Sequence, residues 1–117
     1  MKVLYVSAEV HPFIKTGGLA DVAYALPKAL CQKGIDARVI MPKYSEIPQD
    51  FSGKMSFVSS FTVSVGWRNQ YCGLYSLVYD GVTYYFIDNE YYFKRPGCYG
   101  YYDDGERFAF FCRAVLE

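Results

Sequence analysis

The sequence has 117 residues, of which 52% are hydrophobic and 20% aromatic, enough for one packed domain and no more. Lysine plus arginine and aspartate plus glutamate number 12 each. This balance argues against the basic surface that binds nucleic acid or anionic membranes, so we predict neither partner. No apolar run approaches the roughly 18 residues of a membrane-spanning helix.

The cysteines and the single histidine argue against a metal site. The four cysteines are irregularly spaced and form no C-x-x-C pair, and the only histidine is His11. We therefore predict no metal and no cofactor. Isolated cysteines usually stay reduced in protein cores, which favours a cytoplasmic location. The opening MKVLYVSAEV contains Glu9 and lacks a small-residue cleavage site, which favours a strand of the mature protein over a signal peptide.

The first 41 residues predict a βαβ unit. Residues 2–7 carry a continuous apolar run, which is typical of a parallel strand buried on both faces. Residues 36–41, DARVIM, predict a second strand that Pro42 closes. Between them, apolar residues recur at helical spacing and predict a helix with one apolar face, made of Leu19, Val22, Ala23, Leu26, Ala29 and Leu30.

The middle of the chain predicts a β-rich insert. Residues 55–65 alternate polar and apolar side chains, as a half-exposed strand does. Residues 70–79 and 82–88 flank Asp80-Gly81, a strong signal for a tight hairpin. We expect the insert to return to the sheet through the segment VTYYFID. The predicted fold class is therefore α/β, with a Rossmann-like parallel sheet and a β-hairpin insert.

The last fifteen residues predict the start of a helix. Asp103 and Glu106 have the spacing of a capping box. The predicted inner face consists of Phe108, Phe111, Cys112 and Val115. Because Glu117 comes about three turns into this pattern, we expect the chain to be part of something longer.

The loop before the first helix is the best candidate for chemistry. In the stretch EVHPFIKTGGLADV, Lys15, Gly17 and Gly18 stand at the helix start, at the carboxyl edge of the predicted sheet, where open α/β folds bind ligands. Free N–H groups, the helix dipole and a lysine suit a diphosphate. The same residues also fit a plain turn with a solvated lysine, and Asp21 fits dipole compensation. Neither G-x-G-x-x-G nor G-x-x-x-x-G-K-[ST] is present.

The motifs resemble those of bacterial glycogen synthases and plant starch synthases. KTGGLADV is preceded by VSAEVHPF and followed by ALPKAL, and then by DARVIMPKY, VTYYFIDNEYYFKRPGCYGY and ERFAFFCRA, in family order. The resemblance implies the GT-B arrangement of two Rossmann-like domains across a cleft. It also implies a retaining transfer of glucose from ADP-glucose to the non-reducing end of an α-1,4-glucan such as glycogen.

The resemblance also assigns the loop residues. Lys15 matches the lysine that contacts the phosphates and sugar of the donor. Gly17 and Gly18 match the glycines whose backbone donates to the diphosphate, and Asp21 matches an aspartate implicated in donor binding or activity. No catalytic residue is assigned, because the active-site histidine of the family and its C-terminal donor-binding residues follow later in the sequence.

Further cleft candidates are Glu9, His11, Phe93 and Tyr99. Glu9 and His11 follow the first strand, and His11 equally suits a local turn. Residues 84–111 are rich in aromatic rings that could stack on sugar or adenine, although a core role is the alternative. Phe93 stands where relatives can carry tyrosine.

Residues 1–117 are thus expected to form a truncated N-terminal catalytic domain, without the C-terminal domain and inactive alone. A stand-alone nucleotide or sugar-phosphate binding module without catalysis is the alternative. A dinucleotide oxidoreductase domain and a purely structural fragment are weaker alternatives. The preference for ADP- over UDP-glucose, the acceptor length and the oligomeric state are left open by the sequence.

Overall fold

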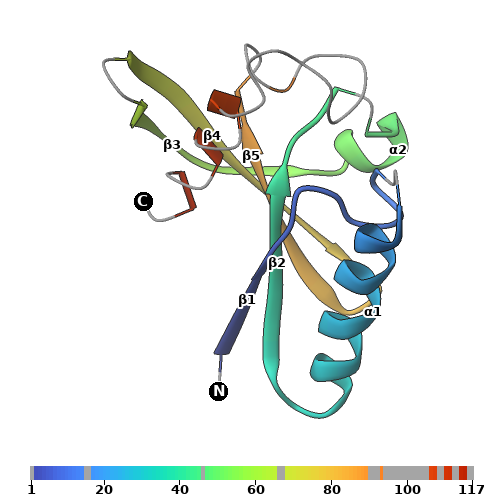
Figure 1. Ribbon diagram of the computed structural model, residues 1–117. Coiled ribbons are helices and arrows are strands. Elements are labelled where there is room, and N and C mark those ends of the chain that lie inside the picture. Colours follow the sequence, from blue (N-terminus) through green and yellow to red (C-terminus); the bar gives the residue numbers. More distant parts are fainter. Residues whose placement is uncertain are drawn as a thin grey trace.

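The computed structural model describes residues 2–14, 17–45, 47–65, 68–89, 93, 106–107, 110–111 and 114–115. Its helices and strands are β1 (Lys2–Val6), α1 (Gly18–Gln32), β2 (Asp36–Pro42), α2 (Gln49–Ser52), β3 (Ser56–Val65), β4 (Arg68–Tyr79) and β5 (Val82–Asp88). The strands form one five-stranded sheet in the order β1-β2-β5-β4-β3 (Figure 1). No helix of the described residues is long and apolar enough to span a membrane.

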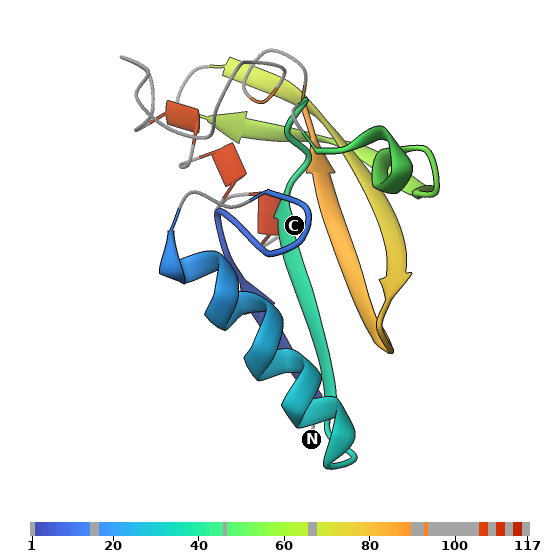
Figure 2. The ribbon, with the colours of Figure 1, turned by 90° about the vertical axis from the view of Figure 1, so that its right-hand side faces the viewer.

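The predicted βαβ unit is confirmed. β1 pairs in parallel with β2 from Lys2 opposite Asp36 to Val6 opposite Ile40. Helix α1 connects them and lies along one face of this part of the sheet (Figure 2). Its buried residues are Ala20, Ala23 and Pro27. These side chains are short or compact, so the helix axis lies close to the strands.

The predicted hairpin and its return to the sheet are also confirmed. Asp80 (φ 54°) and Gly81 (φ 81°) form the turn between β4 and β5 with left-handed backbone conformations, as a type I′ turn requires. β5 then pairs in parallel with β2, while β3, β4 and β5 are antiparallel to one another. Three parallel strands, β1, β2 and β5, therefore end at the same edge of the sheet.

Two apolar faces expected to be buried are not. Leu4 and Val6 of β1 are 48% and 45% exposed, and Leu19, Val22 and Leu26 of α1 are about half exposed. β1 is an edge strand in this sheet. Of the predicted helix face only Ala23 is among the buried residues, because α1 packs on the sheet through its alanines and proline. The larger apolar side chains lie on the flank of the helix, where no described element covers them.

The core lies between the sheet and the segments that cover it. The Phe13 ring makes edge contacts with Tyr84 and Phe86 at centroid distances of 4.9 and 5.2 Å, and with Phe51 at 5.0 Å. Phe51 belongs to α2, a short helix that the sequence patterns did not predict. The loop after β1 is thus fastened to the sheet by a large buried ring.

The described residues near the C-terminus are helical, on the side of the sheet away from α1 (Figures 1 and 2). Phe111 is buried and Val115 half-buried, as predicted, whereas Phe108, Cys112 and Asp103 lie outside the described residues. Burial of Arg107, Phe110 and Ala114 moves the inner face about one residue earlier than the sequence pattern indicated.

Candidate functional site

The candidate loop occupies the place that the sequence predicted. It follows β1 at the carboxyl edge of the three parallel strands and leads into α1, which begins at Gly18. Gly17 is the N-terminal cap, in an extended conformation, and makes no side-chain cap. The N–H groups of the first helical turn therefore have no intrahelical partner. Lys15 and Thr16 lie outside the described residues.

The first half of this loop is anchored in the protein. Ser7 is buried; its N–H donates to the Ile40 carbonyl at 3.1 Å and its hydroxyl donates to the Glu9 carbonyl at 2.7 Å. The Ile14 N–H donates to the Val10 carbonyl at 3.0 Å and closes a small turn. Val10 is fully buried. The first half of the loop, which leads to the N-terminus of α1, is thus well packed.

Glu9 joins the two ends of the loop. Its side chain is buried, and its Oε1 accepts a hydrogen bond from the Gly17 N–H at 3.1 Å. A carboxylate at a helix N-terminus is favourable because the helix dipole is positive there. The Gly17 N–H is therefore already used within the protein, and an anion at this helix start would meet the N–H groups of the first turn of α1. The sequence predicted that Glu9 follows the first strand. It did not predict that Glu9 contacts Gly17, eight residues later.

The two glycines leave open space beside the backbone. A Cβ built on Gly17 or Gly18 would meet no atom of the described residues within 4 Å. Gly17 has φ −169°, a conformation open to any residue. Within the described residues, neither packing nor backbone strain thus requires glycine here. The open space is what a group approaching the backbone closely would need.

The remaining candidates are arranged as follows. Asp21 is exposed in the first turn of α1. His11 is exposed, its backbone N–H donates to the Ala20 carbonyl at 3.1 Å, and its ring meets Tyr24 edge-on at 5.3 Å. These contacts fit the turn-stabilising alternative.

Phe93 and Tyr99 came from the aromatic segment. Phe93 is fully buried against Tyr44, with ring centroids 5.6 Å apart, and against Phe110 at 6.0 Å. This packing favours the core alternative over stacking on a ligand. Tyr99 lies outside the described residues.

The described residues offer no metal cluster, and the buried Cys72 is not an activated thiol. No three histidine, cysteine or acidic side chains gather among them. Cys31 and Cys72 are free, and burial raises the pKa of the Cys72 thiol to about 11. This thiol stays protonated at neutral pH and is not a nucleophile. Among the described residues, the groups at the start of α1 that could meet a ligand are the backbone N–H groups of its first turn.

Comparison with known proteins identifies the family. The family model for the starch synthase catalytic domain matches residues 2–117. This chain belongs to that family. Over its whole length the chain is 67% identical to the glycogen synthase of Caldicellulosiruptor saccharolyticus, 63% to that of Clostridium botulinum strain Eklund 17B and 65% to that of Geobacillus stearothermophilus. It spans the N-terminal 24% of the length of these relatives.

A solved structure supports the same assignment. The catalytic domain of starch synthase IV from Arabidopsis thaliana, bound to ADP and acarbose, superposes with a TM-score of 0.88 at 30% sequence identity. The match covers 98% of this chain and 24% of that chain. The family resemblance and the α/β fold class, as a partial N-terminal portion of a GT-B starch synthase catalytic domain, are thus confirmed.

Proposed function

We propose that residues 1–117 form the donor-side wall of a retaining glycosyltransferase, its N-terminal catalytic domain. The full protein would transfer glucose from ADP-glucose to the non-reducing end of an α-1,4-glucan such as glycogen. The observation that carries the proposal is the family match over residues 2–117, combined with the open glycine pair at the start of α1. The ADP and acarbose bound to the Arabidopsis relative are a nucleotide and a glucan-like ligand, which supports both substrate classes.

In the proposed complex, the diphosphate lies against the first turn of α1. Gly18 admits it to the backbone, and Gly17 holds the loop to Glu9 while leaving room beside its own Cα. Lys15 would add a full positive charge that offsets the charge left on ADP as the glycosidic bond breaks. Asp21, exposed in the same turn, would face the donor. The cytoplasm, where nucleotide sugars are made, is the proposed location, in agreement with the free Cys31 and Cys72.

The proposal predicts no synthase activity for residues 1–117 alone. Both walls of a cleft are needed to exclude water and to hold the acceptor against the donor. One loop supplies only a fraction of the donor contacts, so the affinity for ADP-glucose should be weak, about millimolar. The C-terminal part found in the longer relatives would supply the remaining contacts.

Replacement of Lys15 in the native protein that carries this segment tests the loop. Lys15→Ala should lower kcat/KM for ADP-glucose by about a hundredfold, because a charge that stabilises the transition state is lost. Lys33→Ala is the matched control, since Lys33 is an exposed lysine at the other end of α1. Equal kinetics for Lys15→Ala and wild type would overturn the assignment of the loop.

A binding module without catalysis is the other function to be tested. It would bind ADP-glucose or a sugar phosphate at the same loop but transfer no glucose to glycogen. The intact mass of the native gene product is the first discriminating measurement: a species much heavier than this chain would support a two-domain synthase. A native product of this chain's own mass that bound ADP-glucose would support the binding module instead.

A further inference from the structure

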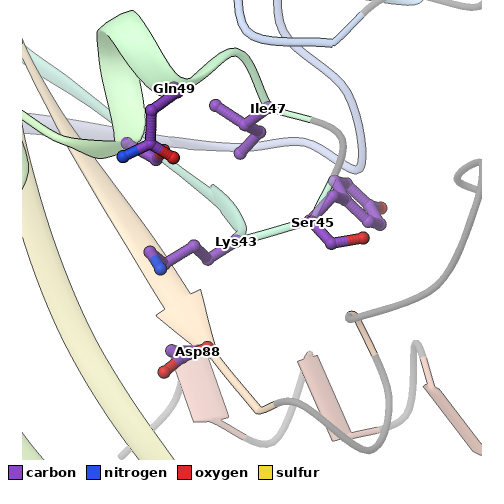
Figure 3. Close-up of a pocket in the computed structure, with 7 residues that line it drawn as sticks. Lys43, Ser45, Ile47, Gln49 and Asp88 are labelled. Atoms are coloured by element: carbon purple, nitrogen blue, oxygen red, sulfur yellow. The ribbon is translucent and has the colours of Figure 1, made fainter.

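A pocket opens at the same edge of the sheet as the loop, and the described residues that line it lie outside that loop. Lys43 follows β2 directly and Asp88 is the last residue of β5, so the pocket lies at the carboxyl ends of two parallel strands. Open α/β sheets bind ligands at this edge. Ser45, Ile47 and Gln49 lie on its other side (Figure 3). A second pocket, lined by Lys2 and Asp36, lies at the opposite, amino ends of β1 and β2.

The size of the pocket limits what it can hold. Its volume is about 190 Å³, below the range of roughly 300–1,000 Å³ that suits drug-sized ligands. It corresponds to about six water molecules at about 30 Å³ each. A space of this size matches one six-membered sugar ring better than a whole nucleotide sugar, and the rest of a longer glucan would lie outside it.

The lining suits a neutral molecule rich in hydroxyl groups. Lys43 and Asp88 contribute opposite charges, so the described lining has no excess charge that would attract a phosphate. In Figure 3 the Lys43 side chain lies between those of Gln49 and Asp88. Ammonium, amide and carboxylate groups together offer both donors and acceptors. Ile47 adds an apolar surface for the C–H face of a sugar ring.

The lining residues are already held in place. The Lys43 N–H donates to the Ile87 carbonyl at 2.8 Å, and Lys43 Nζ lies 4.9 Å from the centroid of the Tyr75 ring. The Ser52 hydroxyl donates to Gln49 Oε1 at 3.3 Å and orients that amide. Such preorganisation lowers the entropy cost of binding.

The pocket is also connected to the donor loop. Tyr44 lines the pocket and is buried. Its hydroxyl donates a hydrogen bond to the Ala8 carbonyl at 2.8 Å. Ala8 lies between Ser7 and Glu9, the residues that support the Gly17–Gly18 helix start. One side of the pocket wall is therefore bonded directly to the base of that loop. A chain held in the pocket would lie on the same edge of the sheet as the donor.

We propose that this pocket binds one glucosyl unit of the α-1,4-glucan, at a site separate from the donor loop. The inference rests on the proposed function, because it takes its ligand from that reaction. Its role is to hold the long polymer on the enzyme, while transfer takes place at the donor loop. Long glucans, which can occupy both places at once, gain affinity from the pocket, and short acceptors do not.

The test uses the native full-length protein and two acceptors, glycogen and maltose. Gln49→Ala and Lys43→Ala each remove a polar group from the pocket and should raise KM for glycogen by about threefold to tenfold. The KM for ADP-glucose and kcat with maltose should stay as in wild type. Gln32→Ala is the matched control, because Gln32 is an exposed glutamine at the end of α1. A direct readout is maltohexaose titration followed by chemical shifts of the Gln49 side-chain amide.

Each outcome separates this inference from the proposed function. If wild type transfers glucose but both pocket variants keep its KM for glycogen, the pocket proposal is wrong and the proposed function stands. If maltohexaose leaves the Gln49 amide unshifted while ADP shifts it, the pocket is a nucleotide site and the proposal is overturned. If wild type transfers no glucose at all, the proposed function fails. A maltohexaose shift at Gln49, lost in Lys43→Ala, would still support a sugar site in that case.

Discussion

At the scale of single residues, Glu9 and the glycine pair explain how a short loop positions the N-terminus of α1 at the edge of the sheet. The buried Glu9 carboxylate holds the Gly17 N–H, and this fixes where the backbone turns into α1. Gly17 and Gly18 have no side chain, and the space beside their backbone stays open, since no described atom would contact a side chain there. Gly81 is different, because its φ of 81° is a backbone conformation that the hairpin turn needs and that favours glycine.

This contrast predicts opposite behaviour for two glycine-to-alanine substitutions in the native protein. Gly17→Ala should leave the free energy of unfolding within about 0.5 kcal/mol of wild type, yet raise KM for ADP-glucose, because its methyl group enters the space proposed for the donor. Gly81→Ala should cost about 1–2 kcal/mol, because alanine disfavours positive φ, and leave that KM unchanged. Urea unfolding and donor kinetics measure both. A Gly17→Ala protein as destabilised as Gly81→Ala would contradict an open donor site.

At the scale of elements, a surface cluster ties α1 to the distant β4–β5 turn. Asp80 Oδ2 accepts a hydrogen bond from the Tyr24 hydroxyl at 2.5 Å and pairs with Lys28 Nζ at 2.8 Å. Lys28 and Tyr24 are one helical turn apart on α1, while Asp80 is in the hairpin turn. The contact helps to hold the helix against the sheet, so that its N-terminus stays at the edge where the loop lies.

The Asp80 contact predicts a pH dependence of stability. Hydrogen bonds from Lys28 and then Tyr24 lower the pKa of Asp80 below its ordinary value of 3.8. Its stabilising contribution is therefore present above pH 3.8 and is lost as the pH falls below that value, through the lowered pKa. Asp80→Asn keeps a residue that tolerates the positive φ of this turn but removes the charge. Its Tm should lie below wild type at pH 6, and thermal unfolding should show this difference shrinking as the pH falls below 3.8. A constant difference in Tm across this range would contradict the ion pair.

At the scale of the whole molecule, the sheet of this chain ends in an unpaired apolar edge. Leu4 and Val6 of β1 are about half exposed, and the outer edge of β1 has no neighbouring strand among the described residues. Half-exposed Leu19, Val22 and Leu26 lie on the flank of α1. Exposed apolar strand edges attract other chains.

We therefore expect residues 1–117, when isolated, to self-associate through this edge. Sedimentation velocity should show a weight-average mass that rises with concentration. The double variant Leu4→Lys and Val6→Lys should shift the species toward monomer, because charges on an edge strand oppose pairing. Tyr71→Lys and Val78→Lys, exposed residues of the interior strand β4, serve as the control pair. A mass of the wild-type segment that does not change with concentration would contradict association through the β1 edge.

The sequence by itself determined the local structure and the family. Periodicity located β1, α1 and β2, and the pair Asp80-Gly81 located the hairpin. The order of motifs around KTGGLADV identified the relatives. Each of these signals depends only on residues close together in the sequence. Tertiary structure alone decided that Glu9 holds Gly17, that α1 packs through its alanines rather than its leucines, and that residues after β2 and β5 form a pocket. These features depend on contacts between residues far apart in the chain, and such contacts exist only once the strands have taken their order in the sheet.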